Sequence, residues 1–120
     1  MAKILIVDDS AFARNSLSMM VENGGHDVVG RAEGGEQALK LFKSLHPELV
    51  MLDYLMPDKN GEVVLKEMIQ DDANARVIII SGSADHTIEE RVLKAGAKVF
   101  LEKPVVQTEL LNVIDQVMET

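Results

Sequence analysis

Short apolar runs alternate with helix-spaced apolar patterns along this sequence, and the alternation restricts its fold more than any other feature. The runs stand at residues 4–7, 28–29, 49–52, 76–80 and 97–101. Such runs, bounded by turn residues, are typical of strands covered on both faces, and strands that alternate with helices form a parallel sheet. At 120 residues and 47% apolar content, the chain can bury one core. We predict one α/β domain over residues 1–120, a (βα)5 doubly wound parallel five-stranded sheet.

Turn and capping residues between the runs set the expected limits of the helices. Ser10 is a good N-cap for the first helix, and Thr87 and Glu90 are spaced as a capping box for the fourth. Val106, near the start of the last helix, is a poor capping residue. The helices are expected from Ser10 to Gly24, from Gly34 to just before Pro47, from Gly61 to a loop at 71–74, from Thr87 to Gly96, and from about Val106 to near Thr120.

Polar side chains follow four of the expected strands. They are Asp8 and Asp9 after the first strand, Asp53 after the third, Ser81 after the fourth and Lys103 just beyond the fifth. Right-handed crossovers place the carboxyl ends of parallel strands at one edge of the sheet, where open α/β sheets bind ligands. We therefore expect these five residues to converge on one site.

The residue types at this edge favour phosphoryl chemistry. Three carboxylates in close proximity repel one another, and a proton or a cation must relieve the repulsion. Oxygen ligands without cysteine suit Mg²⁺. A carboxylate such as Asp53 can attack phosphorus and form an acyl phosphate. The ammonium of Lys103 and the hydroxyl of Ser81 can then stabilise the transferring group, as phosphoryl transfer requires.

Charge and composition exclude several other classes. With 20 acidic and 12 basic residues the net charge is −8, so neither nucleic acid nor an anionic membrane surface is expected as a partner. The absence of cysteine excludes disulfides and thiol chemistry. No stretch approaches the roughly 20 apolar residues of a membrane span. We expect a cytoplasmic protein, and a stand-alone one because the pattern begins near Met1 and ends near Thr120.

Four segments carry a resemblance to a known family. They are Val7-Asp8-Asp9-Ser10, Asp53 followed by Met56-Pro57 and Gly61, Ile80-Ser81-Gly82, and Phe100-Leu101-Glu102-Lys103-Pro104. With these segments the whole chain resembles a response-regulator receiver domain of two-component signalling, the family of the chemotaxis regulator. The resemblance implies a flavodoxin-like three-layer sandwich with strand order 2-1-3-4-5.

The resemblance also implies roles for the residues at the sheet edge. Asp53 would accept a phosphoryl group from the phosphohistidine of a histidine kinase or a histidine phosphotransferase. Lys103 would precede a cis peptide bond to Pro104, which an X–Pro bond permits at low cost. The implied Mg²⁺ ligands are Asp9, Asp53 and the backbone carbonyl of Leu55, with Asp8 acting largely through water.

A conformational switch is implied by the same resemblance. Ser81 occupies the position of the family's hydroxyl residue, and Phe100 that of an aromatic residue that turns inward after phosphorylation. The movement would reshape the face formed by the fourth helix, the fifth strand and the last helix, where a downstream protein would bind. We expect a monomer, or a dimer that forms through this face on phosphorylation. Such a domain signals, and assists its own phosphorylation and dephosphorylation, without being a free-standing enzyme.

Other interpretations of these residues stay open. A Mg²⁺-dependent phosphohydrolase similar to the haloacid dehalogenase superfamily would share the aspartyl nucleophile, but it needs a second acid where this chain has Leu55. A degenerate receiver would act by binding alone. A dinucleotide-binding module is disfavoured because no Gly-x-Gly-x-x-Gly or Walker A sequence follows the first strand. Residues 8–10 can equally be a helix cap, Phe100 a core residue and Arg14 a solvated charge.

Overall fold

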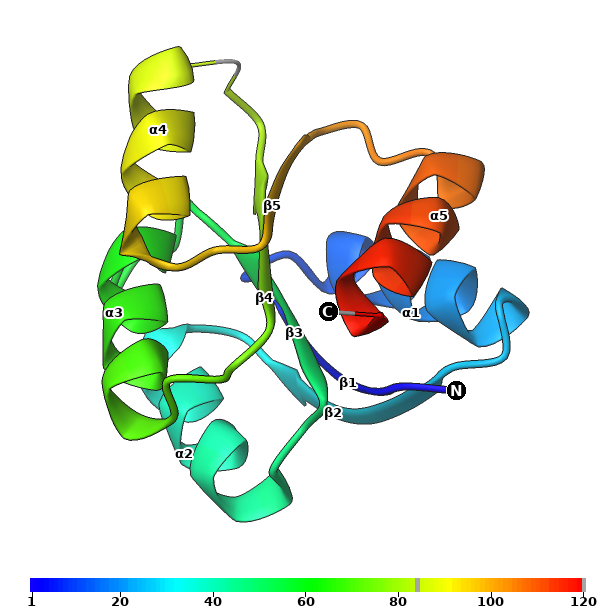
Figure 1. Ribbon diagram of the computed structural model, residues 1–120. Helices are drawn as coiled ribbons and strands as arrows, with labels where there is room; N and C mark the ends of the chain where they lie inside the picture. Colours follow the sequence, from blue (N-terminus) through cyan, green and yellow to red (C-terminus); the bar gives the residue numbers. More distant parts are fainter. Residues whose placement is uncertain (84, 120) are drawn as a thin grey trace.

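The chain forms a three-layer α/β sandwich, seen here in a computed structural model that describes residues 1–83 and 85–119. Five parallel strands stand in the order β2-β1-β3-β4-β5. Helices α1 and α5 cover one face of the sheet, and α2, α3 and α4 cover the other (Figure 1). The strands are β1 Lys3–Val7, β2 Asp27–Ala32, β3 Leu49–Asp53, β4 Val77–Ser81 and β5 Val99–Glu102. The helices are α1 Ala11–Asn23, α2 Gly35–Leu45, α3 Gly61–Asp71, α4 His86–Ala95 and α5 Gln107–Met118. The predicted fold class and strand order are confirmed.

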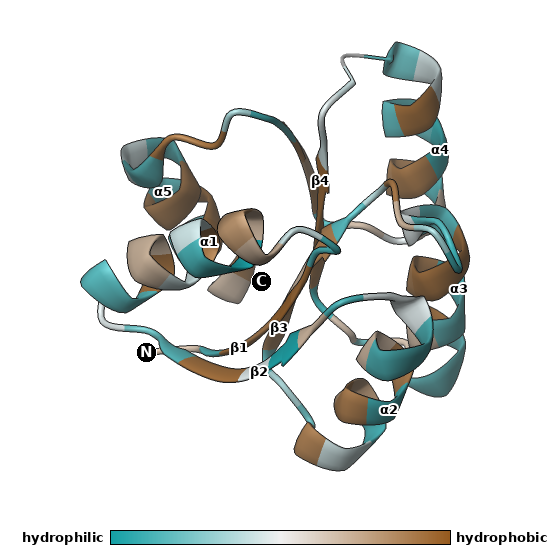
Figure 2. Ribbon diagram, turned by 180° about the vertical axis from the view of Figure 1, so that it is seen from behind, coloured by the Kyte–Doolittle hydropathy of each residue, from teal (hydrophilic) through white to brown (hydrophobic). Residues whose placement is uncertain are grey.

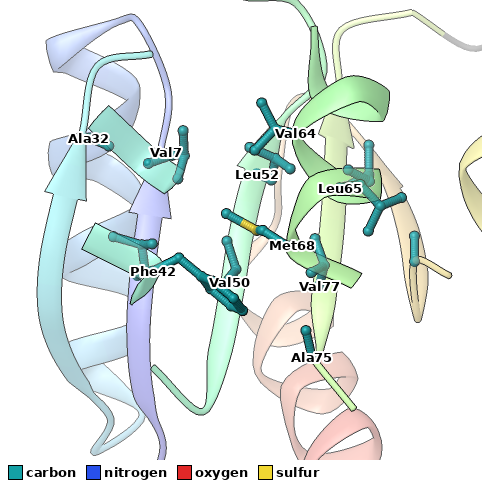
Figure 3. Close-up of a cluster of buried hydrophobic side chains, with 14 of the residues drawn as sticks. Val7, Ala32, Phe42, Val50, Leu52, Val64, Leu65, Met68, Ala75 and Val77 are labelled. Atoms are coloured by element: carbon teal, nitrogen blue, oxygen red, sulfur yellow. The ribbon is translucent and has the colours of Figure 1, made fainter. Parts of the chain in front are cut away.

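The two faces of the sheet carry separate apolar clusters, because successive side chains along a strand point to opposite faces. Leu5, Val50 and Ile79 belong to the cluster under α2, α3 and α4. In Figure 3, Phe42 and Met68 extend from the helices over the strand residues of this cluster. Ile4, and the residues of the other strands that point to the same face as Ile4, pack against α1 and α5 instead. The hydropathy colouring follows the same division, with the central strands hydrophobic and the outer surfaces of the helices largely hydrophilic (Figure 2). Because helices cover both faces of the sheet, the carboxyl ends of its strands, where the site lies, are held in place.

The element boundaries differ from expectation at several places. Strand β4 begins one residue later than predicted, and β5 begins at Val99, two residues later. The capping box expected at Thr87 and Glu90 is wrong, because Asp85 caps α4 and accepts a hydrogen bond from the backbone N–H of Thr87 at 2.8 Å. Asp85 lies two residues upstream and reaches the free N–H groups first. Thr120, the expected end of the last helix, lies outside the described residues.

Two other capping predictions are confirmed. The Ser10 side chain accepts a hydrogen bond from the backbone N–H of Ala13 at 3.2 Å, as an N-cap residue does. Val106 stands at the N-cap of α5, where its aliphatic side chain cannot accept such a bond. Within residues 1–83 and 85–119, no helix combines the length and apolar content that crossing a membrane requires.

Candidate phosphoryl-acceptor and metal site

Three carboxylates meet at the carboxyl end of the sheet. Asp8, Asp9 and Asp53 each offer an oxygen, and these oxygens all lie within 4.8 Å of one another. Asp8 and Asp53 are only 1% and 5% exposed, whereas Asp9 is open to solvent. The close spacing and oxygen-only chemistry of this group fit a hard divalent cation such as Mg²⁺. The three acids thus lie together at the sheet edge, as the strand ends predicted.

Strand register explains why these acids meet. Val7 pairs with Leu52 across the parallel ladder between β1 and β3, so Asp8 and Asp53 follow neighbouring positions in adjacent strands. The N–H of Tyr54 donates to the carbonyl of Ile80 at 2.9 Å, which holds the end of β3 against β4. Buried strand ends cannot spread apart without breaking this pairing. The repulsion between the acids is therefore not relieved by movement of the backbone.

Lys103 supplies a positive charge to the cluster. Its Nζ lies 3.0 Å from Oδ2 of Asp8 and 3.4 Å from Oδ1 of Asp53. Its backbone N–H donates to the carbonyl of Ser81 at 2.8 Å, and the peptide bond that follows, to Pro104, is cis as predicted. The end of β5 is thereby bonded to the end of β4, and the side chain of Lys103 reaches across to the acids.

Charge is unbalanced in the cluster even with Lys103 present. Burial and the neighbouring charge of Asp8 raise the pKa of Asp53 to about 6, and Asp9 adds to the rise, while Lys103 opposes it. Burial acts to lower the pKa of Lys103, but its hydrogen bond to Asp8 and the charges of Asp53 and Asp8 outweigh burial and raise that pKa. One ammonium thus does not offset three carboxylates. A further cation would be attracted here.

The Asp8 carboxylate is largely committed to protein contacts. Oδ1 accepts the backbone N–H of Ser10 at 2.9 Å, and Oδ2 accepts the ammonium of Lys103. Arg14 donates to the backbone carbonyl of Asp8 at 2.7 Å and pairs with Glu33, with its side chain only 13% exposed. Interpreting Arg14 as a solvated charge is therefore wrong. Two of the three acids, Asp9 and Asp53, have freer oxygens facing a cleft.

That cleft opens at the surface beside the acids, and its lining residues are Asp9, Asp53, Leu55, Met56, Pro57, Gly82 and Lys103. The Leu55 side chain is 76% exposed at its mouth. The loop that carries Leu55 closes on itself, since the N–H of Gly61 donates to the carbonyl of Tyr54 at 2.6 Å. A Cβ on Gly61 would lie 2.8 Å from the Tyr54 Cα, so glycine is required by this close approach. Gly61 is thus structural, at the first residue of α3.

Ser81 and Phe100 lie on the same side of the sheet. Ser81 follows Ile79 by two positions on β4, and Ile79 pairs with Phe100 on β5. Phe100 is half-buried and packs against the cluster under α2, α3 and α4, while Ser81 is buried and its Oγ accepts the N–H of Ser83 at 3.1 Å. The hydroxyl and the ring therefore lie along one face of the sheet.

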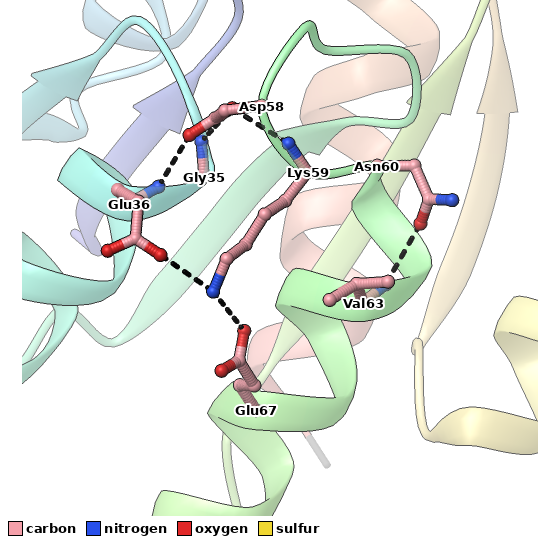
Figure 4. A network of polar contacts seen from close by, with 7 residues as sticks. All are labelled: Gly35, Glu36, Asp58, Lys59, Asn60, Val63 and Glu67. Atoms are coloured by element: carbon pink, nitrogen blue, oxygen red, sulfur yellow. Dashed lines mark hydrogen bonds and ion pairs between the residues drawn. The ribbon is translucent and has the colours of Figure 1, made fainter.

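Some residues around the site were not expected from the sequence. Asp58, in the loop after Asp53, accepts backbone hydrogen bonds from Gly35 and Glu36 at the start of α2, each at 3.0 Å. Lys59 bridges Glu36 to a glutamate on α3 (Figure 4). The only sequence signal for these contacts is the glycine pair at the start of α2, which leaves that helix without a side-chain cap of its own.

Comparison with known proteins gives a consistent result. A family model described as the response regulator receiver domain matches residues 4–115. The chain is 38% identical over 116 residues to the chemotaxis protein CheY of Bacillus subtilis, covering 97% of each chain. It is 35% identical over 115 residues to CheY of Thermotoga maritima, covering 96% of each. The crystal structure of the CheX–CheY–BeF3–Mg²⁺ complex from Borrelia burgdorferi contains a similar chain, with a TM-score of 0.93 and 32% identity, over 96% of this chain and 87% of that one.

Proposed function

This chain belongs to the response regulator receiver family, a phosphoacceptor family of two-component signalling, and we propose that Asp53 is the residue that accepts the phosphoryl group. The observation that carries the proposal is the meeting of Asp9, Asp53 and Lys103 at the ends of three strands, beside an open cleft. The domain is proposed to span residues 1–120.

The donor in this proposal is a phosphohistidine of a histidine kinase or a histidine phosphotransferase. An oxygen of Asp53 attacks phosphorus, the new O–P bond forms as the P–N bond breaks, and the imidazole leaves. With a pKa of about 6, Asp53 is largely ionised at neutral pH and is a competent nucleophile. Lys103 stabilises negative charge on the transferring group, and the Ser81 hydroxyl donates a hydrogen bond to one of its oxygens.

The residues proposed to hold Mg²⁺ are Asp9, Asp53 and the backbone carbonyl of Leu55, with Asp8 acting largely through water. The engaged oxygens of Asp8 and the freer ones of Asp9 and Asp53 support this division. When bound, Mg²⁺ supplies positive charge that offsets the carboxylates and the phosphoryl oxygens. Lys103 would keep the ion pairs that it makes with Asp8 and Asp53.

The proposed output is a movement of Ser81 and Phe100. A phosphoryl group on Asp53 attracts the Ser81 hydroxyl, and the space that opens on this face of the sheet admits the Phe100 ring. The face formed by α4, β5 and α5 then changes shape and binds a downstream protein. The protein itself is proposed to be a monomer, or a dimer that forms on phosphorylation. The shared placement of Ser81 and Phe100 along one side of the sheet supports this coupling.

The test is phosphorylation by acetyl phosphate followed by intact mass measurement. A single phosphoryl adduct is expected on the wild-type protein with Mg²⁺, and none on Asp53→Asn or in EDTA. Beryllofluoride with Mg²⁺ should shift NMR signals around Phe100. A wild-type chain that forms no adduct and shows no such shift would favour a degenerate receiver that acts by binding alone.

The same preparation addresses the phosphohydrolase alternative. Such an enzyme requires a general acid two residues after its nucleophile, where this chain has the aliphatic and exposed Leu55. We therefore expect no steady multiple turnover of phosphoesters. Sustained release of phosphate from p-nitrophenyl phosphate, dependent on Asp53, would instead establish a hydrolase.

A further inference from the structure

We propose that Asp58 and Lys59 form a clamp that positions the metal-binding loop by fastening it to the first turn of α2. The clamp is the set of polar contacts that Asp58 and Lys59 make with α2 and α3, drawn in Figure 4. The inference rests on the proposed function, in which the carbonyl of Leu55 is a Mg²⁺ ligand. Both residues would be positioning residues that touch neither the ion nor the phosphoryl group.

The Asp58 contacts supply a cap that α2 lacks. Helix α2 follows Gly34, which has no side chain to accept its first free N–H groups. Oδ1 of Asp58 accepts from Gly35 at 3.0 Å, and Oδ2 accepts from Glu36 at 3.0 Å. Oδ1 also accepts the N–H of Lys59 at 2.9 Å. The bonds from Glu36, Gly35 and Lys59 hold the pKa of Asp58 below its usual value, as expected for a carboxylate at a helix N-terminus.

Lys59 fastens the same loop to two helices. Its Nζ lies 2.7 Å from Oε1 of Glu36 on α2 and 3.1 Å from Oε2 of Glu67 on α3. Hydrogen bonds to Glu36 and Glu67 raise the pKa of the Lys59 ammonium. Exposed ion pairs contribute little singly, so the backbone bonds of Asp58 are the stronger part of the clamp.

The glycine pair before α2 makes room for these contacts. A Cβ on Gly34 would stand 2.9 Å from Oδ1 of Asp58, and a Cβ on Gly35 would stand 2.9 Å from the Cβ of Lys59. Gly34 has a φ of −163°, which any residue can adopt, so its need for glycine is steric. The two glycines thus mark a site where α2 and the loop approach closely.

The fixed span is short, and both of its ends are held. The loop leaves β3 at Asp53, is closed by the bond between Gly61 and Tyr54, and is fastened to α2 by Asp58 in between. Leu55 lies within this span, three residues before Asp58. Partners that orient metal ligands typically change metal affinity by about 10- to 100-fold when removed. Loss of the clamp should therefore weaken Mg²⁺ binding without removing any proposed ligand.

The experiment measures Mg²⁺ affinity by calorimetry at pH 8, with the fluorescence of Tyr54, the single tyrosine of a chain without tryptophan, as a second readout. Asp58→Ala should weaken Mg²⁺ binding by about tenfold. Asp58→Asn, which keeps an acceptor oxygen, should recover part of the loss. Gly34→Ala should weaken binding like Asp58→Ala although it removes no charge. Phosphorylation by acetyl phosphate should require correspondingly more Mg²⁺ in both weakened variants.

The matched control is Asp72→Ala. Asp72 also accepts a backbone hydrogen bond, from Asn74 at 2.9 Å, but it lies after α3 at the opposite edge of the sheet. Urea unfolding gives the stability of each variant. If Asp58 only stabilises the fold, Asp58→Ala and a control variant of equal stability should bind Mg²⁺ with the same affinity. Wild-type affinity in Asp58→Ala and Gly34→Ala would overturn the clamp while leaving the proposed function intact. A wild-type chain without Asp53-dependent Mg²⁺ binding would overturn both.

Discussion

Replacing Asp53 with Asn should stabilise the metal-free protein at neutral and alkaline pH. The pKa of Asp53 is about 6 in the folded chain against an ordinary value of 3.8, so the folded state binds this proton more tightly than the unfolded state. The wild-type protein therefore loses stability as the pH rises from about 4 to about 6. Asn is always neutral and escapes this loss.

The magnitude follows from the same difference. About 2 pH units, at about 1.4 kcal/mol each, give an upper value of about 3 kcal/mol. The carboxylate faces an open cleft where solvent screens its charge, so we expect a gain of about 1–2 kcal/mol at pH 8. The gain should shrink toward pH 4, where Asp53 is protonated in the folded state but only about half protonated in the unfolded state, and it should vanish below about pH 3.

Urea unfolding in EDTA at pH 4.5 and pH 8 measures the effect. Asp115→Asn is the control, because Asp115 is an exposed acid on α5 away from the cluster, and its substitution should show no comparable pH-dependent gain. Saturating Mg²⁺ should reverse the order at pH 8, because only the wild-type site retains the acceptor carboxylate. An Asp53→Asn protein no more stable than wild type at pH 8 in EDTA would refute the electrostatic reasoning.

Three further predictions concern the site and its frame. Gly61→Ala should lower the free energy of unfolding by about 1–3 kcal/mol, measured in urea, because its Cβ would meet the backbone of Tyr54 at 2.8 Å. Arg91→Ala should lower the free energy of unfolding by about 0.5–1 kcal/mol, because its half-exposed guanidinium lies 2.7 Å from the buried Glu62, which keeps Lys66 as a second partner. The loss should shrink in a Glu62→Gln background, and equal losses would argue against the pair. Calorimetric Mg²⁺ affinity should fall by about tenfold for each pH unit below 6 as protons compete for Asp53, and a flat profile would contradict its role as a ligand.

Most of the fold could be predicted because its determinants are local in sequence. Buried parallel strands appear as apolar runs, and the runs at 49–52 and 76–80 match β3 and β4 to within one residue at each end. The edge strand β2 extends over Asp27–Ala32, although only Val28 and Val29 marked it, because an edge strand is half-covered and carries polar residues. The alternation then determined the layers, and the family resemblance supplied the strand order.

The acids could be predicted because each stands directly after an apolar run, and parallel topology brings such positions together. The contacts of Asp58 could not, because Gly35 and Glu36 are more than 20 residues away and no periodic pattern links them. Arg14 was missed for a related reason, since its partner is a backbone carbonyl, which has no signature in the sequence. Side-chain to backbone contacts that follow no periodic pattern are thus where sequence reasoning failed.

The packing of the sheet and the charge of the site depend on each other. Asp8 and Asp53 stand at the ends of strands buried on both faces and paired in register, so neither backbone can retreat from the other's charge. In a looser frame the carboxylates would separate and the pKa of Asp53 would return toward its ordinary value. Here the repulsion persists, and Lys103 offsets only part of it. The rigid core therefore keeps the negative charge of the cluster concentrated, which favours a cation beside Asp53, and under the proposed function the loop that carries Leu55 must be held as firmly as the strands.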